Sequence, residues 1–203
     1  MASLYHYMDC PYCFRVRMYA HERSIKFENV VVERGSPPPE LPSLNPLLRL
    51  PVWINDENKP IFGSNTIIDY LEHSDPDEPL VPTESLPRAR VWMADELARD
   101  GLLEPLIALD RDLGGRDPDN WNLSLYKKKT ARIRRTLNVF EALLGGRKWL
   151  IGDDFTLADL SLALPLSILE RYGIDLADTP ALADLAERLA ARDSMRLARM
   201  RNP

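Results

Sequence analysis

The 203-residue sequence predicts an α/β domain with the element order βαβ-ββα, followed by an all-helical domain. The prolines support this division, because 12 of 17 lie at or before Pro87. The charges agree, since residues 1–84 carry 7 Lys plus Arg against 13 Asp plus Glu. Strand and helix patterns alternate only in this front part, whereas the remainder shows successive helical stripes. We expect domains at residues 1–77 and 87–203, joined by a linker at 78–86.

The first three elements of the α/β domain follow from short local patterns. The segment at residues 4–7 is short and rich in aromatic side chains, which predicts a strand. Pro11 suits the first position of a helix, which helical spacing extends to about Arg23. Residues 27–32 end in three β-branched valines and predict a second strand. A helix between two strands favours a right-handed parallel crossover.

The second half of this domain is expected to be a hairpin followed by a helix. A proline-rich loop at residues 35–46, with at most one helical turn, leads into it. Turn-forming residues at 55–58 separate the strands predicted at 51–54 and 60–62, which are therefore antiparallel. A helix over 64–71 follows, with Ser64 as its expected cap.

The back half predicts helices throughout. A long helical pattern covers residues 86–113 and is expected to bend near Gly101 or Pro105. A second helix over 126–144 is expected to end at the glycine pair that follows it. The remaining expectations are a helix capped by Thr156 with Asp159 in a capping box, and a last helix that begins at Thr179-Pro180.

Composition excludes several classes of protein. Two cysteines cannot form the framework of a disulfide-rich scaffold, and a net charge of −5 disfavours a nucleic-acid binder. The six cations within residues 127–135 are interpreted as a solvated helix face. The most apolar stretch, 155–169, is too short for the roughly 20 residues that span a bilayer. We expect a cytoplasmic protein with neither a nucleic-acid nor a membrane partner.

The segment Cys10-Pro11-Tyr12-Cys13 holds both cysteines and is the strongest chemical signal. A thiol at a helix N-terminus meets unpaired N–H groups and the positive end of the helix dipole, which favour its thiolate. Cys10 is therefore the candidate nucleophile, and Cys13 a candidate resolving thiol. Zinc requires four ligands, and no second cysteine pair exists, so no metal is expected. Two inert structural cysteines remain an alternative, above all for Cys13.

A strand followed by Cys-Pro-Tyr-Cys, a helix and a second strand resembles glutaredoxin. The continuation resembles the glutathione S-transferase superfamily, in particular its cysteine-type classes, such as the omega-like and beta-like transferases, and the two-domain glutaredoxins. The matching pieces are Leu50-Pro51-Val52, the helix at 64–71 and the capping segment at 155–163. The resemblance implies a thioredoxin-like first domain, a helical second domain, glutathione as cosubstrate and a homodimer.

The resemblance also implies roles for individual residues. Cys10 matches the nucleophile, Pro51 matches a cis-proline, and Leu50 matches the residue whose backbone pairs with the cysteine part of glutathione. Ser64 matches the residue that binds the γ-glutamyl carboxylate, a role that suits a hydroxyl at a helix N-terminus. Gly63 departs from the family, which usually has Glu or Gln there to contact the amino end of glutathione. The fold itself also requires a helix cap at Ser64 and a cis-proline at Pro51, whether or not a ligand binds there.

The expected function is a glutathione S-transferase-like enzyme with glutathione-dependent thiol–disulfide oxidoreductase activity through a mixed disulfide on Cys10. Its substrate is an electrophile or a disulfide; a dehalogenase, isomerase or dehydroascorbate reductase would use the same thiol. The alternative is a transcription-associated binding protein that resembles stringent starvation protein A, with the same fold and no catalysis. Gly63 favours that alternative. The paired cysteines, and the lack of histidine at residues 74–79, disfavour it.

Overall fold

The computed structural model describes residues 1–74, 78–117 and 120–200, which form two compact units. One unit comprises Met1–Pro79 together with Ala191–Pro203, and the other comprises Leu80–Ala190. The chain is thus grouped differently from the expected domains, because its last residues pack with the first unit. The expected boundary at residue 77 lies outside the described residues, as do the middle residues of the 74–79 segment.

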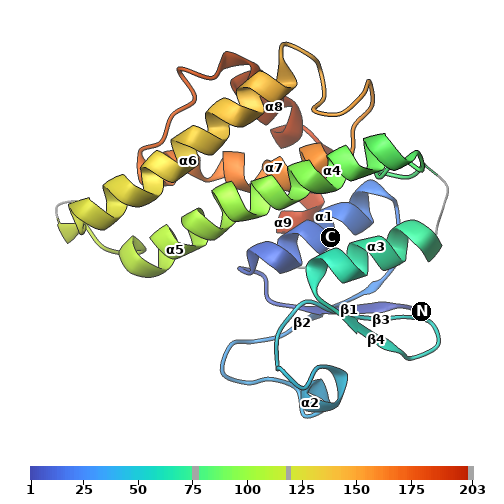
Figure 1. Cartoon of the computed structure of the whole chain (residues 1–203). Coiled ribbons are helices and arrows are strands. Elements are labelled where there is room, and N and C mark those ends of the chain that lie inside the picture. The colour runs from blue at the N-terminus through green and yellow to red at the C-terminus, as the bar shows by residue number, and fades with distance from the viewer. Residues whose placement is uncertain (75–77, 118–119, 201–203) are drawn as a thin grey trace. The chain divides into compact units, whose positions relative to one another are not determined.

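The first unit contains a four-stranded mixed sheet with the strand order β2-β1-β3-β4. Strands β1 and β2 are parallel, whereas β3 is antiparallel to both β1 and β4. Helices α1 and α3 lie over one face of the sheet, and α2 lies on the opposite side (Figure 1). This arrangement confirms the predicted βαβ-ββα order. The elements are β1 (Ser3–His6), α1 (Pro11–Glu22), β2 (Glu28–Val31), α2 (Leu41–Leu44), β3 (Val52–Ile54), β4 (Pro60–Phe62) and α3 (Ser64–Ser74).

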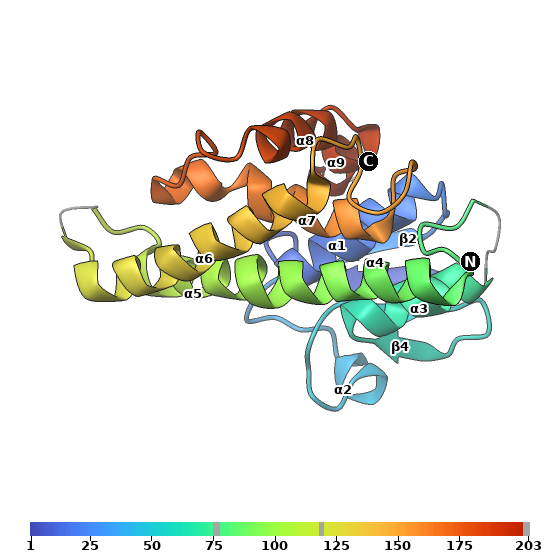
Figure 2. The same cartoon turned by 45° about the horizontal axis from the view of Figure 1, so that its top comes forward.

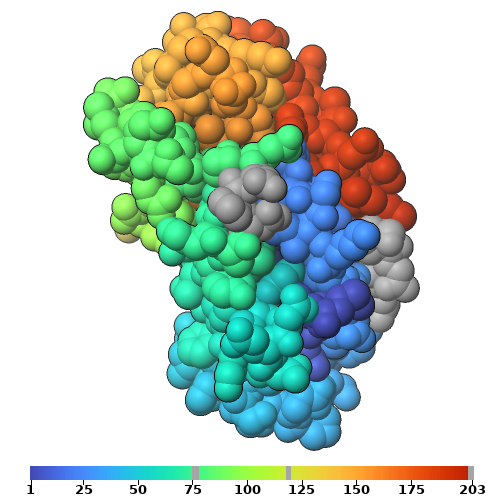
Figure 3. Space-filling view, turned by 90° about the vertical axis from the view of Figure 1, so that its right-hand side faces the viewer, coloured from blue at the N-terminus to red at the C-terminus, as the bar shows by residue number. Residues whose placement is uncertain are grey.

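The N-terminal residues lie at the surface beside the β3–β4 hairpin. The amino group of Met1 is 3.1 Å from a carboxylate oxygen of Asp56 in the hairpin turn. Figure 3 shows the dark blue atoms of the N-terminus beside the teal atoms of this region. The first strand therefore enters the middle of the sheet from an exposed end.

A last helix, α9 (Asp193–Arg199), packs against α1 and was not predicted from the sequence. At one end of α9, the carboxylate of Glu22 accepts hydrogen bonds from Arg192 and from Ser194 Oγ. Near the other end, Arg17 Nε donates to the carbonyl oxygen of Ala198 over 2.9 Å. Hydrogen bonds at two separate positions thus connect α9 to α1 within the first unit.

The second unit is helical, as predicted. Its helices are α4 (Ser85–Ala98), α5 (Glu104–Leu113), α6 (Leu123–Leu144), α7 (Leu157–Ser167) and α8 (Pro180–Ala190), with a 3₁₀ turn at Leu169–Tyr172. Figure 2 shows α4 and α5 in one run of turns with α6 alongside. None of the helices in the described ranges is long and apolar enough to cross a membrane.

A π-helical turn at Arg99–Leu103 lies between α4 and α5, in the region where a bend is expected. It contains Gly101, one of the two expected positions. A Cβ atom on Gly101 would lie 2.5 Å from Thr136 Oγ1 and 2.6 Å from its Cγ2 on α6. Glycine therefore allows this turn to approach α6 more closely than any side chain would permit.

The predicted capping box at the start of α7 is confirmed. Asp159 is fully buried, and its carboxylate accepts hydrogen bonds from Leu150 N, Thr156 N and Thr156 Oγ1 at 2.9–3.1 Å. These donors satisfy the carboxylate inside the unit. The expected end of α6 is also confirmed, because Gly145 follows it with φ of 54° in the left-handed region.

Candidate active site

Cys10 occupies the N-cap position of α1, with extended backbone angles of φ −83° and ψ 120°. Pro11 follows at the first helical position, where its missing N–H leaves no donor unpaired. The Cys10 sulfur accepts a hydrogen bond from Cys13 N over 3.4 Å. Helix N-termini leave several N–H groups without partners. The sulfur therefore lies where a capping oxygen usually does, in the positive field of the helix end.

This position lowers the pKa of the Cys10 thiol from an ordinary 9 to about 7. The largest cause is a hydrogen bond from the Cys13 side chain, and the backbone N–H groups of Cys13 and Tyr12 add to it. The positive charge of Arg34 lowers the pKa further, while burial opposes these effects. The lowered pKa increases the share of Cys10 side chains that are thiolates at neutral pH, and the thiolate is the reactive form.

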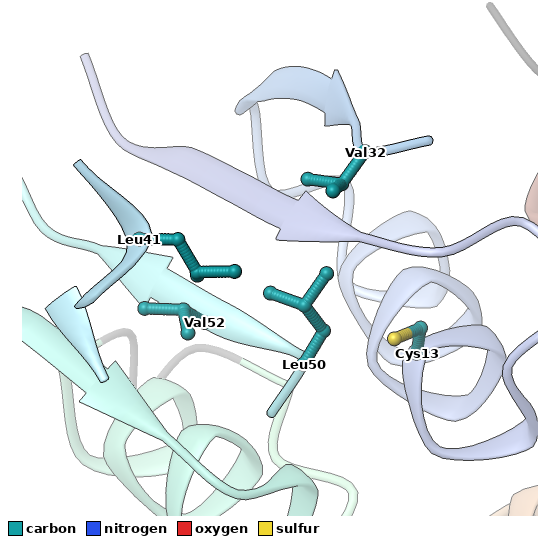
Figure 4. Close-up of a cluster of buried hydrophobic side chains, with 5 residues drawn as sticks. All are labelled: Cys13, Val32, Leu41, Leu50 and Val52. Atoms are coloured by element: carbon teal, nitrogen blue, oxygen red, sulfur yellow. The ribbon is translucent and has the colours of Figure 1, made fainter. Parts of the chain in front are cut away.

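Cys13 lies one turn deeper in α1 and has no exposed surface. Its sulfur points toward Leu50 within a cluster of buried side chains (Figure 4). Burial raises the pKa of the Cys13 thiol well above its ordinary value, and the neighbouring Cys10 raises it further. Cys13 is consequently a protonated donor to Cys10 rather than a nucleophile at neutral pH.

An exposed ion pair lies beside the thiol. Arg34 forms two hydrogen bonds to the carboxylate of Asp9, at 2.9 and 3.1 Å. Its guanidinium carbon is also 4.4 Å from the centre of the Tyr7 ring. Sequence reasoning missed Arg34, since it follows the second strand and no motif relates it to Cys10.

The residues around the expected cis-proline meet the thiol in the same cluster. The Leu50–Pro51 peptide bond is cis, as the resemblance implied. Leu50 is buried and belongs to the cluster of Cys13, Val32, Leu41 and Val52, against which Cys10 packs. The structure therefore brings Cys10, Cys13 and the Leu50–Pro51 segment together, although they come from separate parts of the sequence.

Ser64 is the first residue of α3 rather than its cap, and Gly63 takes the cap position. The carbonyl of Gly63 accepts from Ile67 N over 2.9 Å, which is the first bond of the helix. Gly63 has φ of 89°, a conformation that residues with a side chain rarely adopt. The local backbone therefore favours glycine where the family usually has Glu or Gln.

A buried arginine that sequence reasoning missed lies beside Ser64. Arg15 Nη1 donates to Ser64 Oγ over 3.4 Å and to Asn65 Oδ1. Arg15 is on α1, five residues after Cys10, and therefore connects the helix that carries the thiol to the start of α3. A guanidinium, a hydroxyl and a helix N-terminus together form a suitable environment for a carboxylate.

Among residues 1–74, 78–117 and 120–200, no group of three or more His, Cys, Asp or Glu side chains is arranged to hold a metal ion. Both cysteines are free thiols.

Comparison with known proteins identifies the family. The family model of the glutathione S-transferase N-terminal domain matches residues 4–79, and that of the C-terminal domain matches residues 116–193. The chain belongs to the glutathione S-transferase family. Glutathione S-transferase 3 of Zea mays is 31% identical over 163 residues, which cover 76% of this chain and 72% of that protein.

Other relatives in this family carry different names. A probable maleylacetoacetate isomerase of Caenorhabditis elegans is 29% identical over 92% of this chain and 87% of its own length. A stringent starvation protein A homologue of Haemophilus influenzae is 26% identical over 95% and 87%. Glutathione S-transferase family membership therefore does not by itself determine the reaction.

A solved structure supports the fold. The crystal structure of a glutathione S-transferase from Methylobacillus flagellatus with glutathione bound has a TM-score of 0.84 and 26% identity, and the match covers 98% of each chain. The predicted fold class, a thioredoxin-like domain with a helical domain, is thereby confirmed.

Proposed function

We propose that this protein is a glutathione-dependent thiol–disulfide oxidoreductase whose nucleophile is the Cys10 thiolate. The observation that carries the proposal is the position of Cys10 Sγ at the start of α1, where helix N–H groups and the Cys13 side chain lower the pKa of this thiol to about 7. A thiolate with a pKa near ambient pH combines adequate ionisation with adequate nucleophilicity. The site requires no metal for this chemistry.

The reaction consists of two thiol–disulfide exchanges. The Cys10 thiolate attacks the glutathione sulfur of a glutathionylated substrate, forms a Cys10–glutathione disulfide and releases the substrate thiolate. A second glutathione thiolate then attacks the glutathione sulfur of this disulfide. Oxidised glutathione leaves, and the Cys10 thiolate is regenerated. Overall, one glutathione thiol joins the glutathionyl group of the substrate in oxidised glutathione, and the substrate is released as a thiol.

Glutathione, rather than Cys13, is proposed to resolve the mixed disulfide. Cys13 is fully buried, and burial raises the pKa of its thiol, so little thiolate exists to attack the Cys10 disulfide. The role proposed for Cys13 is instead to donate a hydrogen bond that stabilises the Cys10 thiolate.

The residues proposed to hold glutathione fit a tripeptide with an anionic end. Leu50 would offer its backbone to the cysteine part, next to the cis bond to Pro51. Ser64 would bind the γ-glutamyl carboxylate, with the positive charge of Arg15 directly behind it. Gly63 supplies no side chain to the amino end, so we expect weaker binding than with Glu or Gln there.

Turnover of a glutathionylated peptide by the wild type, Cys10→Ser and Cys13→Ser tests this proposal. We expect Cys10→Ser to lose activity, because serine is not ionised at neutral pH, and Cys13→Ser to retain most of it. Activity that survives in Cys10→Ser would disprove the role of Cys10. Loss of activity in folded Cys13→Ser would show instead that Cys13 resolves the disulfide.

A second candidate is a binding protein without catalysis, supported by the Haemophilus influenzae relative and by Gly63. It predicts that the chain captures RNA polymerase subunits but is not retained on immobilised glutathione. The low pKa of the Cys10 thiol favours the oxidoreductase, because a binding role requires no thiolate. We expect the chain to act as a cytoplasmic homodimer in either case.

A further inference from the structure

A buried arginine lies beneath the reactive thiol and has no part in the chemistry described above. Arg17 is on α1, two helical turns after Cys10, and is only 1% exposed. Side chains on a helix lean toward its N-terminus, so the guanidinium of Arg17 reaches back to the loop that precedes Cys10. There Nη1 donates to the carbonyl of Tyr7 and Nη2 to that of Met8, both over 3.1 Å.

The same guanidinium contacts two further elements. Its Nη1 is 2.8 Å from His6 Nδ1 on β1, and its Nε donates to Ala198 O on α9. An arginine can only donate, so His6 Nδ1 accepts and the ring proton is on Nε2, which donates to Asn29. His6 is therefore neutral. Burial, and then the charge of Arg17, lower the pKa of this histidine.

Arg17 also contributes charge near Cys10, since burial lowers the pKa of the Arg17 guanidinium whereas the charge of a Cys10 thiolate raises it. Among the groups around this thiol, the opposite charges of Asp9 and Arg34 are paired with each other, and both Cys13 and His6 are neutral. No carboxylate forms an ion pair with Arg17 within the described part of the chain. A positive charge in a buried position is weakly screened and stabilises a nearby thiolate.

We propose that Arg17 is a positioning residue for the Cys10 thiol, because it fixes the Tyr7–Met8 backbone and joins it to the C-terminal helix through Ala198. The Tyr7 carbonyl that Arg17 binds also accepts from Cys10 N over 3.5 Å, so the guanidinium reaches the nucleophile through one shared acceptor. Helix α9 thereby helps to hold the Tyr7–Met8 backbone, which precedes Cys10. This inference deepens the proposed function and rests on Cys10 as its nucleophile.

Arg17→Met tests the proposal, and Arg192→Gln is its matched control. Each variant removes hydrogen bonds between α1 and α9 at one of the two positions where these helices are connected. Arg192 acts at Glu22, which is about 18 Å along the helix from Cys10 and outside the range of unscreened charge. The measurement is the rate of Cys10 alkylation by iodoacetamide across pH, followed by intact mass in the full chain.

We expect Arg17→Met to raise the pKa of Cys10 by about half a unit, which lowers its thiolate fraction at pH 7 about twofold. Arg192→Gln is expected to lower thermal stability without moving the pH profile. Arg17→Lys keeps the charge but cannot form the forked contact, so we expect a smaller upward shift than in Arg17→Met. This variant carries the test if Arg17→Met does not fold.

Two results would overturn the inference: an unchanged pH profile in folded Arg17 variants, or an equal shift in Arg192→Gln, which would indicate a general effect of loosening α9. Alkylation reports the state of Cys10 whether or not the protein is an oxidoreductase. A pKa shift without turnover of any glutathionylated substrate would therefore contradict the proposed function and leave the role of Arg17 intact.

Discussion

Replacing Cys13 by alanine should make Cys10 a weaker acid. The pKa of the Cys10 thiol is lowered by two units, from 9 to about 7, and the largest cause is the hydrogen bond from the Cys13 side chain. A shift of this size corresponds to roughly 3 kcal/mol in favour of the thiolate. Removing the largest contribution should raise the pKa by about one unit, so that thiolate at pH 7 falls from about half to about a tenth.

The rate at a single pH would understate this change. A thiolate with a higher pKa is a better nucleophile, by about threefold per unit for the usual Brønsted coefficient. Cys13→Ala should therefore react only about twofold more slowly at pH 7, and faster than the wild type at alkaline pH, where both thiols are ionised. The decisive assay is the complete pH profile of alkylation, or titration of the thiolate by its ultraviolet absorbance.

Cys13→Ser is the matched control, because its hydroxyl keeps a donor at the same position. We expect the pKa of Cys10 in this variant to stay nearer 7 than in Cys13→Ala. Identical profiles for the wild type and Cys13→Ala would refute the idea that the Cys13 side chain stabilises the thiolate. Thermal unfolding of both variants separates this effect from a loss of packing.

Three further predictions concern charge, close approach and buried polar groups. Arg34→Gln should raise the pKa of Cys10 by less than a unit, and added salt should shrink the difference between it and the wild type, since Arg34 is exposed. Gly101→Ala should lower the free energy of unfolding by about 1–3 kcal/mol, because the added Cβ clashes with Thr136. In the double variant, Thr136→Ala should relieve part of this loss. Losses that simply add in the double variant would contradict the clash. Asp159→Ala should cost about 2–4 kcal/mol in chemical denaturation because it leaves buried N–H donors unpaired, and a loss below 1 kcal/mol would argue against that reason.

Local patterns were sufficient to predict the elements around the thiol. The spacing of Cys10, Pro11 and Cys13 places the first cysteine at a helix start, and the structure has it there. A bend of the long helix was expected near Gly101 or Pro105, and the structure has a π-helical turn there, at Arg99–Leu103. The π-helical form of this turn was not predicted, and neither was its close approach to Thr136, which lies 35 residues away in the sequence.

The elements that sequence reasoning missed depend on distant contacts. Helix α9 has only seven residues, and the hydrogen bonds at its two ends are formed with Glu22 and Arg17 on α1. One signal was visible, since Arg17 occupies the same helical stripe as Cys13 and Val16. A charged residue on a buried stripe requires partners, and here its partners are the carbonyls of the reactive loop and of α9.

The central claim is that Cys10 forms a mixed disulfide with glutathione, and intact mass after incubation with oxidised glutathione tests it most directly. The wild type and Cys13→Ser should each gain the mass of one glutathionyl group, and the reductant dithiothreitol should remove it. Cys10→Ser should gain none. An adduct that persists in Cys10→Ser, or its absence from the wild type, would contradict the claim.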